Sequence, residues 1–258
     1  MEIKCIFVAP ILMTMKRFFT IFTLLLLSAP TLFAQSEDYD EAQRYFTPEQ
    51  MPDMRQFLPG PPAKGSVEMN FDEAMYQYAK QLRETDPEAA QAAKEQSNSH
   101  ISNLCKQFSE AFGMEISQQN TPEIYTLMRD AVITCVMTVI EPKEFYARPR
   151  PFLYYSEDTL MPDKEGQLQK NGSFPSGHTL RGWTAALLLT EINPAAANEL
   201  LKKGYQYGQS RVISGYHWQS DVNAARLVAA ATVAQCHSSE RFQKQMKRAK
   251  REFKKLSK

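Results

Sequence analysis

Three short segments of the chain contain the side chains that phosphate-ester chemistry requires. They are residues 143–151, residues 175–178 and residues 210–221. In this order they supply cations, a Ser-Gly turn, two histidines and a carboxylate that could orient one of the histidines. These residue types suit the binding of a phosphate dianion and its transfer to a histidine nitrogen.

The first segment places Lys143, Arg148 and Arg150 beside two prolines. Proline fixes its own φ and restricts the residue before it, so we expect these cations on a rigid loop that follows a helix. Arginine binds phosphate through a planar fork, and lysine adds a compact charge. Taken alone, the segment is equally consistent with ordinary surface charge beside prolines.

The second segment, Pro-Ser-Gly-His, leads directly into an apolar run typical of a buried helix. Backbone N–H groups at a helix start point toward a bound anion, and Gly177 allows close approach of the backbone. The Ser176 hydroxyl could donate a further hydrogen bond, and His178 could protonate a leaving oxygen. Arg181, one turn later, could face the same pocket or form a structural ion pair. Ser and Gly before a helix often serve only as caps.

The third segment contains the candidate nucleophile. His217 and Asp221 are four residues apart, so on a helix they share a face. A carboxylate bonded to one ring nitrogen fixes the tautomer and leaves the other nitrogen basic. Arg211 could reach the phosphate from another side. The alternative makes His217 a capping residue and Asp221 a charge at the start of a helix.

The sequence predicts a site that needs no metal and no other cofactor. Beyond residue 34 the histidines are His100, His178, His217 and His237. No HExxH pattern or similar cluster occurs, and the cations near the His-Asp pair would repel a metal ion.

The pattern along the chain predicts an all-α fold in a single compact helical domain. Helical periodicity begins at Phe71, and Pro-containing start signals follow at residues 86–88, 121–123 and 193–194. We expect a long helix over residues 121–140 that Glu141-Pro142 ends. Further helices are expected over residues 178–191 and 221–235. No alternating run indicates a strand.

The chain divides into four expected parts. Residues 1–34 have the charged, apolar and small-residue order of a signal peptide, with Met13 or Met15 as alternative starts, and a retained membrane anchor is the other interpretation. Residues 35–66 form a proline-rich arm, and residues 67–240 form the catalytic helical domain. Residues 241–258 form a basic C-terminal helix or tail.

Composition narrows the partners and the location. Without residues 1–34 the formal charge moves from +1 to −1, which gives no support for nucleic-acid binding. No later segment is long and apolar enough to span a bilayer, so we expect a periplasmic or secreted protein. Residues 241–258 contain nine Lys/Arg against one Glu, most simply a solvated helix, although a membrane surface or an anionic partner is a second interpretation. Cys105, Cys135 and Cys236 remain after cleavage, and their pairing stays open.

The combined pattern Lys-x6-Arg-Pro, Pro-Ser-Gly-His and Ser-Arg-x5-His-x3-Asp resembles that of the type 2 phosphatidic acid phosphatase superfamily, which includes vanadium haloperoxidases. Within it, the chain looks most similar to the class A bacterial nonspecific acid phosphatases over roughly residues 55–235. Residues 57–62, 71–74 and 216–221 and Tyr146 add to the likeness. Ser214 replaces a cysteine expected in many relatives, and Gly60 interrupts the expected proline run.

The resemblance implies a role for each site residue. Lys143, Arg150 and Arg211 would bind the phosphate oxygens together with Ser176 and the Gly177 amide. His217 would attack phosphorus, Asp221 would orient it, and His178 would protonate the leaving alcohol and then activate water. Tyr146, Arg148 and Arg181 would stand behind these residues.

The implied activity is a metal-independent acid phosphatase of broad specificity for phosphate monoesters, inhibited by phosphate or vanadate. A homodimer is left open. The alternatives are a lipid phosphate or polyprenyl diphosphate phosphatase, a vanadate-dependent haloperoxidase, and an anion-binding protein without turnover. A binding protein would gain nothing from the paired proton-transfer groups of His178, His217 and Asp221.

Overall fold

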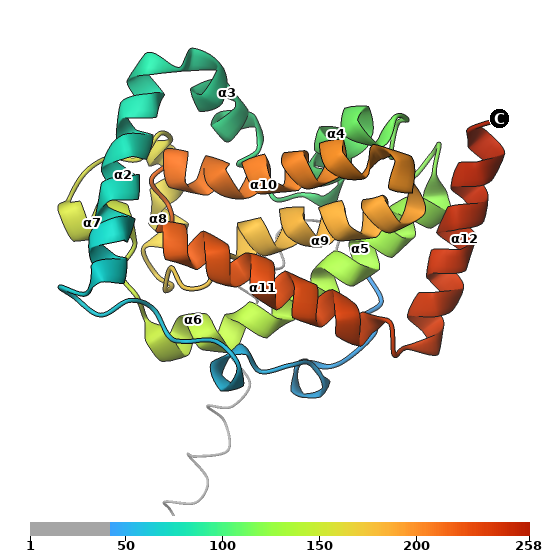
Figure 1. The fold of residues 1–258 in the computed structure, drawn as a ribbon, viewed down its shortest axis with the longest axis horizontal. Coiled ribbons are helices and arrows are strands. Elements are labelled where there is room, and N and C mark those ends of the chain that lie inside the picture. The colour runs from blue at the N-terminus through green and yellow to red at the C-terminus, as the bar shows by residue number, and fades with distance from the viewer. Residues whose placement is uncertain (1–41) are drawn as a thin grey trace, which may run out of the picture. The chain divides into compact units, whose positions relative to one another are not determined.

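The computed structural model describes residues 42–258, and all regular structure within this range is helical (Figure 1). The α-helices are α2 (Val67–Thr85), α3 (Pro87–Glu95), α4 (Ile101–Phe112), α5 (Pro122–Val136), α6 (Ile140–Tyr146), α7 (Pro151–Tyr155), α8 (Glu165–Leu168), α9 (Gly177–Ile192), α10 (Ala197–Ile213), α11 (Gln219–Cys236) and α12 (Glu240–Leu256). Short 3-10 helices cover Pro48–Gln50, Met54–Gln56, Met137–Val139, Pro162–Lys164 and Pro194–Ala196. The all-α prediction is confirmed, whereas the predicted signal peptide, residues 1–34, lies outside the described range.

Several helices begin at capping residues, of which Asp86 and Ser176 stood out in the sequence. The Asp86 side chain accepts a hydrogen bond from the Ala89 amide at the start of α3, and Pro87 occupies the first helical position. Ser176 likewise caps α9, and Ser239 caps α12. Each cap satisfies an amide that the helix itself leaves without a partner.

The helix predicted to end at Ile140 continues in helical form to Tyr146. One 3-10 turn links α5 to α6, and Pro142 lies in the first turn of α6, where the missing N–H removes no helical hydrogen bond. The predicted stop was therefore wrong. Lys143 sits on a helix rather than on the expected loop, and Ala147, with φ 42°, ends that helix.

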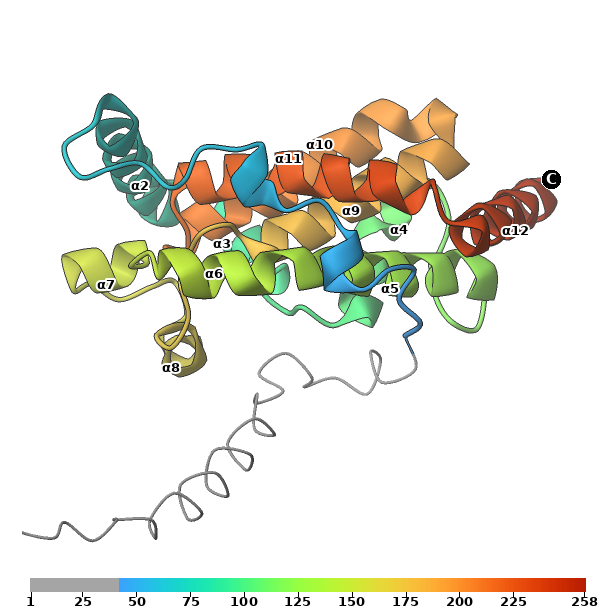
Figure 2. The ribbon, with the colours of Figure 1, turned by 90° about the horizontal axis from the view of Figure 1, so that it is seen from below.

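Helix α9 lies in the middle of the domain, between α10, α11 and α5 (Figures 1 and 2). Its apolar side chains are buried around most of the helix, as expected for a central helix, and only Trp183 and Leu187 among them are partly exposed. Two glycines bring α9 and α10 close together. A Cβ at Gly182 would lie 2.5 Å from Tyr207 Cδ1, and one at Gly204 would lie 2.5 Å from Ala186 Cβ.

The described part of the proline-rich segment packs on α5, α6 and α12. The Tyr45 ring makes an edge contact with Phe242 of α12 at 5.1 Å, and its amide donates to Thr134 Oγ1. Gly60 packs against Tyr146, whose Cε1 would lie 2.9 Å from an added Cβ. Glycine at this position therefore permits the close contact between the segment and α6.

Helix α2 does not bury Phe71, the residue at which the helical periodicity begins. Phe71 and Tyr78 are exposed, whereas Asp72 is completely buried. The Asp72 carboxylate accepts hydrogen bonds from the Ser220 amide and from Arg148, so polar contacts set the rotation of this helix.

Two further observations concern the core and the helix lengths. Cys105, Cys135 and Cys236 are all buried, and Cys135 of α5 lies beside Cys236 of α11. Within residues 42–258, no helix combines the length and the apolar character needed to cross a membrane.

Candidate active site

The predicted site residues come together where four helices meet. The starts of α9 and α11 lie beside the last turn of α10, at the left in Figure 1, and α6 approaches from below. The Ser176 amide donates to the Asp221 carbonyl at 3.1 Å, which joins the first turns of α9 and α11. The His217 amide donates to the Arg211 carbonyl at 3.3 Å, so α10 fixes the turn before α11. Residues from all three sequence segments therefore share one site.

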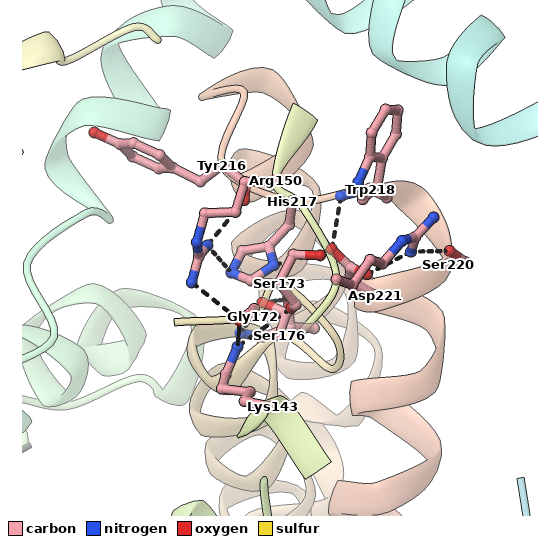
Figure 3. Close-up of polar contacts among 12 residues, drawn as sticks. Lys143, Arg150, Gly172, Ser173, Ser176, Tyr216, His217, Trp218, Ser220 and Asp221 are labelled. Atoms are coloured by element: carbon pink, nitrogen blue, oxygen red, sulfur yellow. Dashed lines mark hydrogen bonds and ion pairs between the residues drawn. The ribbon is translucent and has the colours of Figure 1, made fainter. Parts of the chain in front are cut away.

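His217 lies in the turn just before α11, and both its ring nitrogens have defined partners (Figure 3). Nδ1 is 3.2 Å from Asp221 Oδ2, and Nε2 is 3.2 Å from Arg150 Nη1. A carboxylate accepts and a guanidinium donates, so Nδ1 must carry the proton and Nε2 must carry the lone pair. The ring is neutral in this arrangement, with its basic nitrogen directed at a cation.

Asp221 is held by more than its histidine. Its Oδ2 also accepts from the Trp218 amide at 2.9 Å, and its Oδ1 accepts from Arg148 Nη1 at 2.6 Å. Arg148 in turn donates from Nη2 to Asp72 Oδ2 at 2.7 Å. Both carboxylates are completely buried, and Arg148 bridges them. The orienting carboxylate is thus fixed by a buried ion pair and by a backbone amide.

Lys143 and Arg150 converge on the backbone of the segment before α9 (Figure 3). Lys143 Nζ donates to the Gly172 and Ser173 carbonyls at 2.9 and 3.2 Å. Arg150 donates to the Tyr216 carbonyl at 2.9 Å and to Asn171 Oδ1 at 2.6 Å. These contacts hold both cations in place beside the His217 ring.

Arg211 is buried, and some of its hydrogen-bond donors have no acceptor within the described residues. Its guanidinium lies over the Tyr216 ring at 4.6 Å, and its Nε and Nη1 atoms find no hydrogen-bond partner among residues 42–258. An uncompensated buried guanidinium is costly unless an anion completes its hydrogen bonds. Arg211 is therefore the side chain of the site best prepared to accept one.

Burial shifts the pKa values of all three cations. Desolvation lowers the pKa of Arg150 to about 10, with an opposing contribution from Asp221, and lowers the pKa of Arg211 to about 10 as well. Burial, followed by the Arg150 charge, lowers the pKa of Lys143 well below its ordinary value. The arginines stay charged at neutral pH, and so the site strongly favours a bound anion.

His178, the second residue of α9, is also buried and neutral. Its ring stacks on Tyr207 at 4.8 Å with an interplanar angle of 5°, and its Nε2 hydrogen-bonds to the Gln96 carbonyl. Because a carbonyl only accepts, Nε2 carries the proton. Burial, then the charges of Arg211 and Arg181, lower the pKa of His178 well below its usual value. Burial, then Arg150 and Lys143, lower that of His217.

Ser176 and Gly177 form the start of α9 beneath the cations. The Ser176 hydroxyl accepts from the Thr179 amide at 3.3 Å and from the Thr179 hydroxyl at 2.9 Å. In both contacts the Ser176 oxygen is the acceptor, so its hydroxyl proton is available for a hydrogen bond to an anion. A Cβ at Gly177 would lie 3.9 Å from Lys143 Cε, so the start of α9 lies close to this cation.

Three residues were expected behind the phosphate-binding side chains, and each of them makes a different kind of contact. Arg148 fixes Asp221, and the charge of Arg181 acts on both His178 and Lys143. Tyr146 instead packs on Phe174, with ring centroids 5.3 Å apart. Sequence reasoning missed the roles of Asp72 and Gln96. Asp72 lay within the stretch that resembled the family, whereas nothing in the sequence marked the Gln96 carbonyl.

The donor set of the site fits an anion. Throughout residues 42–258, no cluster of three or more His, Cys, Asp or Glu side chains gathers in a way that could hold a metal ion. Cationic side chains, a hydroxyl and a helix start surround a neutral nucleophilic nitrogen. Such a site can bind a tetrahedral dianion and present it to His217.

Comparison with known proteins identifies relatives over most of the chain. Residues 124–244 match the PAP2 superfamily model. A non-specific acid phosphatase of Providencia stuartii is 45% identical over 215 residues, which cover 83% of this chain and 86% of that protein. A non-specific acid phosphatase of Salmonella typhimurium is 33% identical, with 87% and 89% covered. An acid phosphatase of Zymomonas mobilis is 33% identical, with 77% and 75% covered.

Proposed function

The chain belongs to the PAP2 superfamily, and from its site geometry we propose that it is an exported acid phosphatase that cleaves phosphate monoesters through a phosphohistidine. The relatives named non-specific acid phosphatase support the activity and a broad substrate range. The order of charged, apolar and small residues in the first 34 positions supports export.

One observation supports the mechanism most strongly: the His217 ring is held between Asp221 at Nδ1 and Arg150 at Nε2. With the proton fixed on Nδ1, the Nε2 lone pair is free to attack once a phosphate takes the Arg150 contact. In the first step the Nε2–P bond forms and the ester P–O bond breaks. Asp221 stabilises the positive charge that develops on the ring.

His178 acts on the leaving group in the first step and on water in the second. Its imidazolium form donates a proton to the departing alkoxide, which leaves as the alcohol. Neutral His178 then accepts a proton from water as the water oxygen attacks phosphorus. The Nε2–P bond breaks, and inorganic phosphate leaves with His217 neutral again.

The cations bind the nonbridging oxygens and stabilise the charge of the transition state. Arg211 contributes its unpaired donors, and Arg150, Lys143, the Ser176 hydroxyl and the Gly177 amide supply the other donors. A planar guanidinium can bind two oxygens at once, which fixes phosphorus for attack in line with the leaving oxygen.

The directions in which the pKa values of His178 and His217 shift predict an acid pH optimum for the reaction. His178 must be protonated to start the reaction, and burial with the Arg211 and Arg181 charges holds its pKa low. A bound dianion offsets these charges and raises that pKa, while His217 stays neutral under the combined effect of burial, Arg150 and Lys143. The rate should therefore fall as pH rises from acid toward neutral.

Replacement of the nucleophile tests the proposal. His217→Ala should lose at least about 10³-fold in kcat on an aryl phosphate, while the matched surface variant His237→Ala, 44% exposed, keeps wild-type activity. Wild-type activity in His217→Ala would rule out the mechanism. Turnover of a soluble aryl phosphate against a dispersed lipid phosphate separates a monoesterase from a lipid phosphatase.

A further inference from the structure

Helix α12 carries a row of cations that the active site does not use. Its exposed Lys and Arg side chains are Lys244, Lys247, Arg248, Arg251, Lys254 and Lys255, here called the basic stripe. At 100° per residue these six positions fall within about 120° of the helix circumference and extend along about 17 Å of its axis. The opposite face buries Phe242, Met246 and Ala249 against the domain. The stripe is therefore held rigidly and turned outward.

Most of the stripe has no local counter-charge. Lys244 pairs with Glu240, and Arg248 pairs with Glu123. The remaining four form no ion pair with any residue between 42 and 258. Residues 241–258 sum to a formal charge of +8, whereas residues 1–240 sum to −7. Such segregation gives the protein a strong charge asymmetry and would orient α12 toward an anionic surface.

A hollow of about 400 Å³ lies beside the stripe, between α12 and the start of α5. Arg248, Arg251 and Lys255 line it, together with Asn120 and the half-exposed Leu256. The two carboxylates in its wall are already engaged, since Glu252 accepts from the Glu123 and Ile124 amides and Glu123 pairs with Arg248. The hollow could hold a phosphate-bearing headgroup next to the stripe.

We propose that the basic stripe of α12 binds the protein peripherally to a bilayer of anionic phospholipids. A straight row of cations on one face can contact a flat anionic surface along its whole length, and each cation contributes roughly five-fold to partitioning. A single-stranded nucleic acid fits less well, because the aromatic residues of α12, Phe242 and Phe253, pack inward and offer no stacking surface.

This binding mode keeps the active site accessible. Lys250 of α12 pairs with Glu191 at the end of α9, whereas Ser176 and His178 lie at its start. The 16 residues of α9 span about 24 Å, so the site lies at the end of α9 away from α12 (Figures 1 and 2). A docked protein would still hydrolyse soluble monoesters released near the membrane.

Vesicle sedimentation of the full chain tests the proposal. We expect binding to vesicles of phosphatidylcholine with phosphatidylglycerol, little binding to phosphatidylcholine alone, and loss of binding as salt rises. The variant Lys247→Gln, Arg251→Gln, Lys254→Gln and Lys255→Gln should lower the partition coefficient about 100-fold or more at low salt. Glutamine keeps the helix propensity, and hydrolysis of a soluble aryl phosphate should be unchanged, which reports an intact fold.

A matched control separates the stripe from net charge. The variant Lys64→Gln, Lys94→Gln, Lys106→Gln and Lys202→Gln removes the same charge from exposed positions outside α12 and should bind vesicles like the wild type. Equal binding to neutral and anionic vesicles, or an equal loss in both variants, would overturn the proposal. So would retention by single-stranded DNA without retention by anionic vesicles.

Discussion

Arg148 and Asp221 form a buried ion pair, with Nη1 2.6 Å from Oδ1, and this pair leaves the other carboxylate oxygen to His217. One carboxylate oxygen of Asp221 therefore pairs with the cation that fixes it, and the other orients the histidine. Asp72 completes the unit by accepting a hydrogen bond from the other Arg148 nitrogen, Nη2. The catalytic pair thus depends on α2, a helix well separated from it in sequence.

Arg148→Gln should reduce both catalysis and stability. Asp221 and Asp72 would remain buried without their shared cation, and breaking a buried pair costs about 3–5 kcal/mol of unfolding free energy. We expect kcat to fall by about 10- to 100-fold with a smaller change in KM, because Arg148 acts through Asp221 rather than on the phosphate.

The pH profile distinguishes this positioning role from general loss of structure. In Arg148→Gln the acid limb of kcat/KM, which reports the His217 pair, should shift, and Arg148→Lys should restore part of kcat. Arg55→Gln, which breaks a surface pair with Asp53, should leave kcat and the profile unchanged. An unshifted profile in Arg148→Gln would argue against a link through Asp221.

His178→Asn should slow the cleavage of esters with poor leaving groups more than that of esters with good leaving groups. An alkyl phosphate needs a proton on its departing oxygen, whereas p-nitrophenolate leaves without one. The first step should therefore drop by about 10²- to 10⁴-fold for an alkyl ester and far less for p-nitrophenyl phosphate. Burst kinetics measure the first step directly, and an equal loss for both esters would contradict the assignment of His178 as the acid.

Acid should destabilise the free protein through its buried histidines. The folded pKa values of His178 and His217 lie below the unfolded value of about 6.5, so below that pH the unfolded chain binds protons that the native state does not. The free energy of unfolding therefore falls as pH drops from about 6.5 toward the folded values, by at most about 1.4 kcal/mol per pH unit for each histidine.

Denaturant unfolding between pH 7 and pH 5 measures this effect. His178→Gln should show a smaller loss of stability over that window than the wild type, because one of the two contributions is removed. Saturating phosphate should stabilise the wild type throughout by binding only the native state. Identical slopes in the wild type and the variant would mean that His178 titrates normally in the folded protein.

Treatment with a chelator should leave hydrolysis unaffected. The proposed chemistry uses only groups of the chain itself, with positive charge supplied by Lys143, Arg150 and Arg211. We expect kcat and KM for an aryl phosphate to be unchanged after incubation with EDTA and dialysis, with or without added Mg²⁺ or Zn²⁺. A loss of activity that one of these ions restores would require a metal in the mechanism.

Local patterns predicted the helices and much of the site. Capping residues marked the starts of α3 and α9, and the motif spacing placed Lys143, His178, His217 and their partners in one site, where they do lie together. The histidine and the carboxylate pair although His217 lies just outside the helix, because the turn before α11 brings Nδ1 to the first-turn Asp221.

The features of the fold and the site that local patterns did not predict depend on contacts between segments distant in sequence. Pro142 looked like a helix stop, yet it occupies a first turn that tolerates proline. No role was predicted for Asp72, because its partner Arg148 lies 76 residues away in the sequence. The contact between His178 and the Gln96 carbonyl uses a backbone atom, which no residue type could indicate.

Trapping the phosphorylated enzyme tests the central claim most directly. His178→Asn mixed with p-nitrophenyl phosphate should form the intermediate readily and lose it slowly, because the second step lacks its base. An alkaline quench preserves a P–N bond, and peptide mass spectrometry should find one phosphoryl group on His217. The same variant with His217→Ala added should carry none. Phosphate on another residue, or phosphorylation that persists without His217, would contradict the mechanism.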